Sequence, residues 1–90
     1  MNYLIQLGTD TEWSYPFKKE QIPSYVDYRS QGNTIAITRH LRDAMRFPTR
    51  EEADKFMKSD IVVLGIAEIN NSKRILGRPI YEPQIMEVPL

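Results

Sequence analysis

The stretch that decides the fold is PTREEADKFMKSDIVVLGIAEI, residues 48–69, where a strong helix start precedes the longest apolar run of the chain. Thr49 can cap a helix because its hydroxyl can accept a hydrogen bond from the Glu52 amide, and Glu52 can reach back in return. Apolar residues then recur at helical spacing, with acidic residues near the start and lysines further on. This pattern predicts a main helix from Arg50 to Lys58.

The segment Ile61–Ile69, which begins with the apolar run Ile61–Ala67, comes directly after that helix and the pair Ser59-Asp60. A short, continuous run of β-branched and aliphatic residues is typical of a strand that is buried on both faces. We therefore predict a central strand here, with Gly65 as a candidate bulge. The polar residues Asn70–Lys73 that follow predict a turn.

One strand and one β-hairpin are also predicted nearer the N-terminus. Residues 3–7 favour a strand that stops at Gly8, and residues 18–23 read as a loop. Residues 25–29 and 34–39 flank a turn in which Gly32 can adopt positive φ, so they predict a β-hairpin. Leu41, Ala44 and Met45 have helical spacing, which allows a short helical turn before Pro48.

The C-terminal residues read as extended chain. Residues 74–80 predict a short strand or loop, because glycine and proline interrupt them. Prolines at positions 79, 83 and 89 then favour an extended segment over residues 79–90 rather than a helix. Residues 84–88 of that segment can pair as a final edge strand.

Together these elements predict one α+β domain spanning residues 1–90. A chain of 90 residues, 41% of them hydrophobic, supports a single core. The expected architecture is a mostly antiparallel sheet of four to five strands with one main helix packed on one face. The expected core consists of Ile5, Leu7, Ile35, Ile37, Phe47, Ala53, Phe56, Ile61, Val63 and Ile66.

Composition argues against several classes of function. There is no cysteine, and the isolated glycines form no phosphate-binding loop. The only histidine, His40, has no neighbours that would complete a catalytic or metal site. We therefore expect no catalytic residue, no cofactor and no metal ion. The apolar runs are far shorter than the roughly 20 residues of a membrane helix, so we expect no membrane span and a cytoplasmic location.

Charge is segregated along the chain although the net charge is zero. Residues 28–50 hold five arginines and one acid, whereas residues 51–68 hold five acids and two lysines. Arginines recur three or four residues apart, at Arg39, Arg42, Arg46 and Arg50, and can bind phosphate or carboxylate groups. The competing interpretation is that the acids just beyond neutralise these arginines within the domain.

Aromatic residues offer a second candidate surface. Trp13, Tyr15 and Phe17 alternate with other residues, so in an extended segment their rings would share one face. Such rings can anchor a protein partner or stack on single-stranded bases. They can equally belong to the core. Trp13 and Tyr15 join the four arginines as candidate partner-binding residues.

The segment DAMRFPTREEADKF, residues 43–56, resembles a module of small accessory proteins of bacteriophages and prophages. Ala44, Phe47, Thr49, Glu52 and Ala53 carry the resemblance, in the pattern A-x-x-F-x-T-x-x-E-A. The resemblance implies a compact α+β domain in a bacterial host, with relatives that mostly lack catalytic residues. Some such relatives bind and inhibit host proteins, including defence nucleases.

These observations favour a binding module that is not an enzyme. Its expected partner is a host or phage protein, with inhibition of a host defence system as one form of the activity and self-association as another. The alternative is a nucleic-acid-binding protein that uses the basic segment Arg39–Arg50. A small hydrolytic or acid–base enzyme ranks third.

Overall fold

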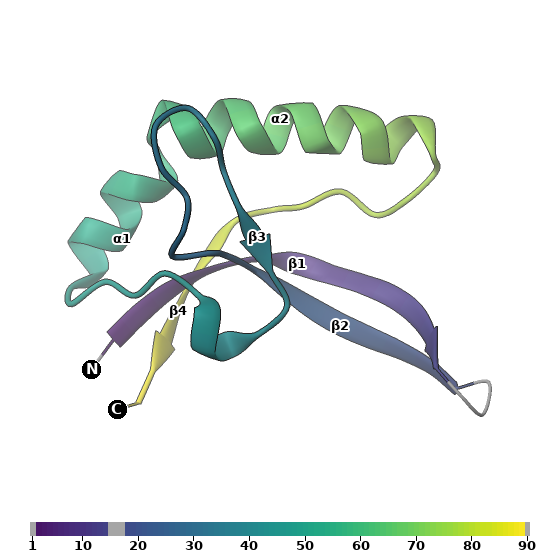
Figure 1. The fold of residues 1–90 in the computed structure, drawn as a ribbon, viewed down its shortest axis with the longest axis horizontal. Helices are drawn as coiled ribbons and strands as arrows, with labels where there is room; N and C mark the ends of the chain where they lie inside the picture. Colours follow the sequence, from purple (N-terminus) through teal and green to yellow (C-terminus); the bar gives the residue numbers. More distant parts are fainter. Residues whose placement is uncertain (1, 15–17, 90) are drawn as a thin grey trace.

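The computed structural model describes residues 2–14 and 18–89. Its sheet has the strand order β3-β2-β1-β4 and is antiparallel throughout. Two α-helices lie together on one face of this sheet (Figure 1). The elements are β1 (Asn2–Ser14), β2 (Lys18–Val26), β3 (Ile37–Thr38), the 3-10 turn η1 (Leu41–Asp43), α1 (Arg50–Met57), α2 (Asp60–Ile75) and β4 (Gln84–Val88). The α+β class is confirmed, with four strands in the described residues and two helices in place of one main helix.

β1 runs well past Gly8, where the sequence predicted its end, and residues 18–23 form most of β2 rather than a loop. The two strands pair out to Ser14 and Lys18, so cross-strand hydrogen bonding outweighs the weak local preference. The register shifts between Gln6 and Gly8. Gly8 has a φ of 146°, and a Cβ there would lie 3.2 Å from Cδ1 of Tyr81. Glycine therefore serves a bend and a close approach at this position.

The predicted hairpin of residues 25–39 exists in a reduced form. Tyr25 pairs with Thr38 and Val26 with Ile37, so β3 has only two residues. Gly32 has the expected positive φ, 61°, inside a tight turn closed by hydrogen bonds between Gln31 and Thr34. Side chains rather than strand pairing hold the rest of this loop together.

Helix α1 forms as the sequence predicted. The Thr49 hydroxyl accepts a hydrogen bond of 3.2 Å from the Glu52 amide, which satisfies one of the orphan donors of the first turn. Ala53 is fully buried, and the ring of Phe56 packs 5.5 Å from the ring of Phe47. This contact fixes α1 against the sheet near the start of β1.

The second helix, α2, contradicts the predicted strand at Ile61–Ile69 and the predicted turn at Asn70–Lys73. It begins directly after Ser59, whose carbonyl accepts hydrogen bonds from the amides of Val62 and Val63. Its buried residues are Val62, Ile66, Asn70 and Lys73, a helical spacing that continues through the polar segment. A short apolar run fits a buried strand and a helix equally well, and here the polar half completes the helical face.

The core lies on both faces of β1. Ile5 and Leu7 face the helices and pack with Phe47, Ala53, Val62 and Ile66, whereas Leu4 packs on the opposite face with Tyr25 and Ala44. Of the ten expected core residues, Ile5, Leu7, Phe47, Ala53 and Ile66 are buried, and Ile35, Ile37, Phe56 and Ile61 pack partly buried against the core. Val63 was wrongly assigned, because in a helix it turns away from the sheet and is 52% exposed.

Gly65 is not a bulge but the point where α2 meets Ile35. A Cβ on Gly65 would lie 2.5 Å from Cγ2 and 3.2 Å from Cβ of Ile35. An alanine normally stabilises a helix interior by about 1 kcal/mol relative to glycine. We expect Gly65→Ala instead to destabilise the domain by about 1 to 3 kcal/mol, because the added methyl overpacks the contact. Urea denaturation measures this difference.

The matched comparison repeats the substitution in an Ile35→Ala background, which removes the Cγ2 atom 2.5 Å from the added methyl and leaves only the Cβ atom 3.2 Å from it. There Gly65→Ala should cost clearly less than in the parent, because the helix preference of alanine offsets a much weaker contact. An equal loss in both backgrounds would contradict the proposed contact between Gly65 and Ile35.

Candidate functional site

The four arginines of the predicted basic segment do not share one helix. Arg39 follows β3, Arg42 lies in η1, Arg46 lies in the extended segment after it, and Arg50 is the first residue of α1. All four are exposed. The guanidinium of Arg46 donates a hydrogen bond of 3.4 Å to the carbonyl of Leu41. The four arginines would share one helical face only in a continuous helix, and the turn η1 and Pro48 interrupt that helix.

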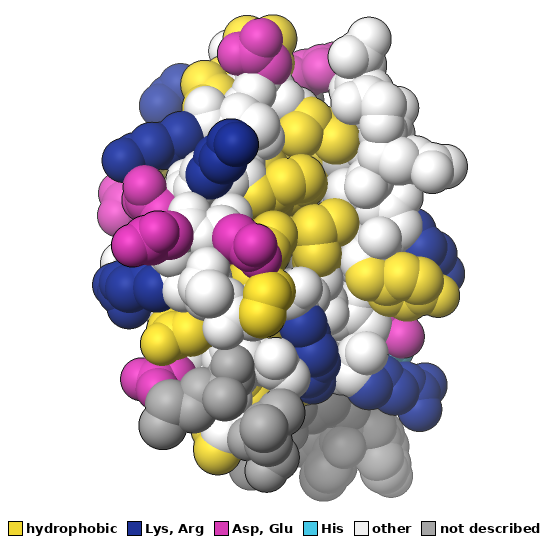
Figure 2. Space-filling model, turned by 90° about the vertical axis from the view of Figure 1, so that its left-hand side faces the viewer, with side chains coloured by type: hydrophobic (Ala, Val, Ile, Leu, Met, Phe, Trp, Pro, Cys, Tyr) yellow, Lys and Arg dark blue, Asp and Glu magenta, His cyan; other side chains and the backbone are white. Residues whose placement is uncertain are grey.

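Neutralisation by neighbouring acids, the competing interpretation, does not account for Arg42, Arg46 and Arg50. Within the described part of the chain, none of these three guanidinium groups forms a salt bridge. Asp54, which follows the arginine series, instead contacts Lys58 at 2.9 Å. Figure 2 shows basic and acidic side chains interspersed beside a band of hydrophobic ones on one face of the molecule. That face therefore carries no continuous basic surface.

The two aromatic candidates cannot be placed as a surface. Tyr15 lies outside the described residues, and only the backbone of Trp13 is described, paired with Lys19 in β1. Elsewhere Tyr25 is buried in the core, whereas Tyr28 is exposed with the Arg29 guanidinium 5.3 Å from its ring centre. The predicted aromatic face remains a prediction.

A buried carboxylate organises the loop after β2. Asp27 is almost fully buried and accepts hydrogen bonds from the backbone amide, Nε and Nη2 of Arg29, at 2.7 to 2.9 Å. The Ser30 hydroxyl bonds both the amide and the carbonyl of Ala36 across the same loop. The side-chain hydrogen bonds from Arg29 hold the pKa of Asp27 below its usual value, against the opposing effect of burial. This pair is structural and closes the loop.

The Asp27 pair predicts a specific acid sensitivity. Because the pKa of Asp27 is lower in the folded than in the unfolded chain, its contribution to stability is present above about pH 4. That contribution should disappear as the pH falls through the folded-state pKa. We expect Asp27→Asn to be less stable than the parent at neutral pH and to lose less stability on acidification below pH about 4.

Chemical denaturation at a series of pH values measures this effect. Arg29→Met provides the partner control, because it removes the side chain that lowers the pKa of Asp27. This variant should also lose less stability than the parent on acidification. If the free energy of unfolding fell as steeply with decreasing pH in both variants as in the parent, the proposed role of the Asp27–Arg29 pair would be contradicted.

A buried polar contact joins α2 to the segment that leads into β4. The side chain of Asn70 donates to the Tyr81 carbonyl at 2.9 Å and accepts from the Tyr81 amide at 2.7 Å. The Tyr81 hydroxyl lies 3.3 Å from the Ser24 hydroxyl, and the Lys73 ammonium lies 4.1 Å from the ring centre of Tyr81. Sequence reasoning missed this group because its members are far apart in the chain and Asn70 looked like a turn residue.

The first candidate binding surface lies beside α2. A groove of about 500 Å³, here called the α2 groove, runs between α2 and residues 81–83. Its apolar wall includes Met57, Val63, Ala67, Tyr81 and Pro83, and Arg74 and Glu82 add charges of both signs. Val63 and Ala67 border this groove, and with Leu64 they form an exposed apolar surface that we call the α2 face.

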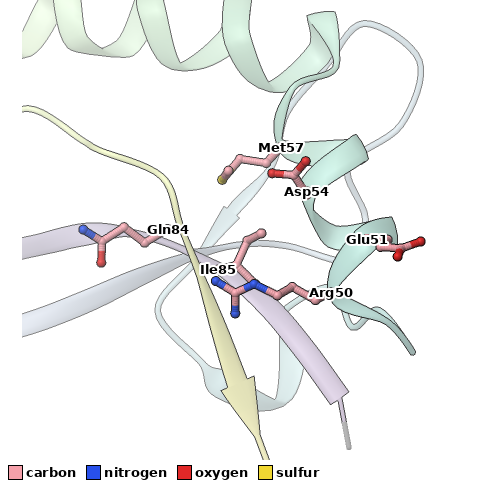
Figure 3. A pocket seen from close by; sticks show the side chains of 6 residues that line it. All are labelled: Arg50, Glu51, Asp54, Met57, Gln84 and Ile85. Atoms are coloured by element: carbon pink, nitrogen blue, oxygen red, sulfur yellow. The ribbon is translucent and has the colours of Figure 1, made fainter.

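The second candidate surface lies between α1 and β4. A groove of about 720 Å³, here called the β4 groove, is lined by Arg50, Glu51, Asp54, Met57, Gln84 and Ile85. Figure 3 shows the Arg50 side chain extending from α1 toward Ile85, while Glu51 points away from β4. Met57 borders both grooves. Of the predicted site residues, only Arg50 belongs to either groove.

In residues 2–14 and 18–89, no three histidine, cysteine or acidic residues come together in a way that could hold a metal ion. His40 is exposed at the end of β3. No helix of the described chain combines the length and apolarity needed to cross a membrane.

The chain matches no protein-family model, no curated protein and no solved structure.

Proposed function

We propose that this protein is a binding module without enzymatic activity that engages a protein partner through the α2 face and the α2 groove. The observation that supports this most strongly is the run Ile61–Ala67, seven consecutive apolar residues in one helix. A helix that is apolar all round is ordinarily buried all round. Here Val62 and Ile66 face the core, while Val63 and Leu64 are 52% and 65% exposed.

The α2 groove adds shape to this apolar surface. Tyr81 and Pro83 form its opposite wall, and the two hydrogen bonds between the Asn70 side chain and the Tyr81 backbone hold Tyr81 in position. A preformed wall lowers the ordering cost that a partner must overcome on binding. Arg74 and Glu82 would orient a partner by charge while apolar side chains fill the groove.

The identity of the partner follows from the proposed origin of the chain. If the module at residues 43–56 reflects a phage or prophage accessory protein, the partner is a host or phage protein. Inhibition of a host defence system is then one outcome of binding. The exposed apolar residues of α2 support partner binding whatever the origin of the chain.

Capture from a lysate of the source cell tests the proposal. Partners retained by the tagged parent chain should be lost with Leu64→Glu or Val63→Glu, because a charge would be buried in the apolar contact. Both positions are exposed, so the free energy of unfolding should change by less than about 0.5 kcal/mol. Quantitative mass spectrometry of the captured proteins provides the readout.

The matched control is Asn71→Glu, which adds the same charge at an exposed position further along α2. It should retain the partners that Leu64→Glu loses. A set of captured proteins that is the same for all four chains would contradict binding through the α2 face.

Nucleic-acid binding is the second candidate, favoured by the exposed guanidinium groups of Arg42, Arg46 and Arg50. It predicts an affinity that falls steeply with added salt, because bound phosphates release counterions. Charge reversal at Arg42 and Arg46 should weaken binding further, whereas Leu64→Glu should not. Gel-shift titration at several salt concentrations separates this candidate from the first, and no shift at low salt would reject it.

A further inference from the structure

Strand β4 leaves a hydrogen-bonding edge of the sheet uncovered. The sheet order places β4 at one edge, with β1 as its neighbour. On the far side of β1, Tyr3 exchanges two backbone hydrogen bonds with Phe47, so the peptide groups of Tyr3 point away from β4. Hydrogen-bonded and non-hydrogen-bonded pairs alternate along an antiparallel ladder. The peptide groups of Glu87 and Ile85, opposite Tyr3 and Ile5, therefore point outward from the sheet.

Two prolines limit this edge to a short pairing segment. Pro83 and Pro89 fall two residues before Ile85 and two residues after Glu87, so they occupy the next outward-facing positions. Proline has no amide hydrogen and is tolerated at such edge positions. The outward donors of this segment are thus the amides of Ile85 and Glu87, and within the described part of the chain no strand lies beyond them.

The β4 groove places charge beside this edge. Ile85 contacts the core on the helix face, and Glu87 shares that face because it lies two residues further along the strand. Arg50 extends from α1 toward Ile85 and forms no salt bridge with a described carboxylate (Figure 3). The β4 groove contains two acids, and neither neutralises Arg50. Asp54 forms a salt bridge with Lys58, and Glu51 points away from β4. A strand added along β4 would meet an uncompensated positive charge here.

We propose that the added strand is β4 of a second copy of this chain, paired antiparallel so that Ile85 of each copy lies opposite Glu87 of the other. In this register all four outward amides find carbonyl partners, and Met86 lies on the two-fold axis. Glu87 of each copy comes beside Arg50 of the other, which gives two symmetric ion pairs. A register with Glu87 opposite Glu87 is disfavoured because like charges would face each other.

The partner copy would also fill part of the β4 groove. In the proposed register its Glu87 and Pro89 lie on the helix face opposite Ile85 and Pro83. Met57 and Ile85 then receive apolar contacts at the groove floor, next to the Arg50 ion pair. The sheet continues through both copies by strand addition. This surface is distinct from the α2 face, which stays uncovered in the pair.

Sedimentation velocity of the full chain, from about 10 μM to about 1 mM, tests the proposal. The parent chain should pass from monomer to dimer across this range. Arg50→Glu and Glu87→Arg should each raise the dimer dissociation constant about tenfold or more, because each variant faces like charges twice per dimer. The double variant Arg50→Glu/Glu87→Arg restores opposite charges and should return to within about threefold of the parent.

Controls and a second readout identify the surface. Arg42→Glu makes the same charge change at an exposed residue that does not line the β4 groove and should leave the dimer intact, as should Leu64→Glu on the α2 face. Amide hydrogen exchange at Ile85 and Glu87 should slow as concentration rises, because these amides become hydrogen-bonded in the dimer. Both charged positions are exposed, and circular dichroism confirms that each variant is folded.

Three results would overturn the proposal: a parent chain that stays monomeric to about 1 mM, a charge swap that does not restore association, or exchange at Ile85 and Glu87 that ignores concentration. Loss of the dimer with Leu64→Glu but not with Arg50→Glu would also overturn it, because self-association would then occur through α2. Partner capture depends on Leu64 and Val63 rather than on Arg50 and Glu87. Failure of dimerisation and failure of the α2 proposal are therefore distinguishable.

Discussion

Strand β1 is the element on which the rest of the structure depends, because it is packed on both faces and paired along both edges. Leu4 and Ile5 are consecutive residues with 0% exposure, so one packs into each of the two hydrophobic clusters. Along its edges β1 pairs with β2, Phe47 and β4. The two helices and β4 therefore pack against or pair with the same strand, whose consecutive residues Leu4 and Ile5 are buried on its two faces.

The two helices differ in how completely they use their apolar residues. α1 is short, and its one fully buried side chain, Ala53, allows a close approach to the sheet. α2 is twice as long and passes over the sheet. Gly65 packs against Ile35, and Asn70 forms hydrogen bonds with Tyr81. These contacts set which side of α2 faces inward. The apolar residues on its other side, Val63 and Leu64, are left at the surface as a consequence.

The two proposed surfaces are compatible with each other in one molecule. Pairing through β4 would leave the α2 face of each copy accessible, so a dimer would present two equivalent binding faces. Two linked faces raise the effective affinity for a partner that can reach both, without any new contact. Met57 lines both grooves, so the two proposed surfaces adjoin each other at this side chain.

Several features of this fold could be predicted from local sequence because short-range interactions decide them. The Thr49 cap, the helix that follows it and the glycine turn at Gly32 all rest on contacts within a few residues. The extended conformation of residues 84–88 followed from the flanking prolines, although the strand itself pairs with residues 2–6 of β1. The α+β class followed from the same signals. Of the predicted site residues, Arg50 alone reached a groove, because the spacing of arginines carries no information about which segments meet.

The sequence by itself therefore determined the helix start at Thr49, the turn at Gly32 and the number of apolar side chains available for burial. Only the tertiary structure decided that residues 60–75 are a helix, since an apolar run of this length satisfies a strand or a helix equally well. The choice depends on Asn70 reaching Tyr81 and on Gly65 admitting Ile35, contacts between residues that are distant in the chain. Asn70 and Tyr81 line the α2 groove, and the β4 groove lies between α1 and β4, so both candidate binding surfaces join segments that are distant in the chain and could not be read from local pattern.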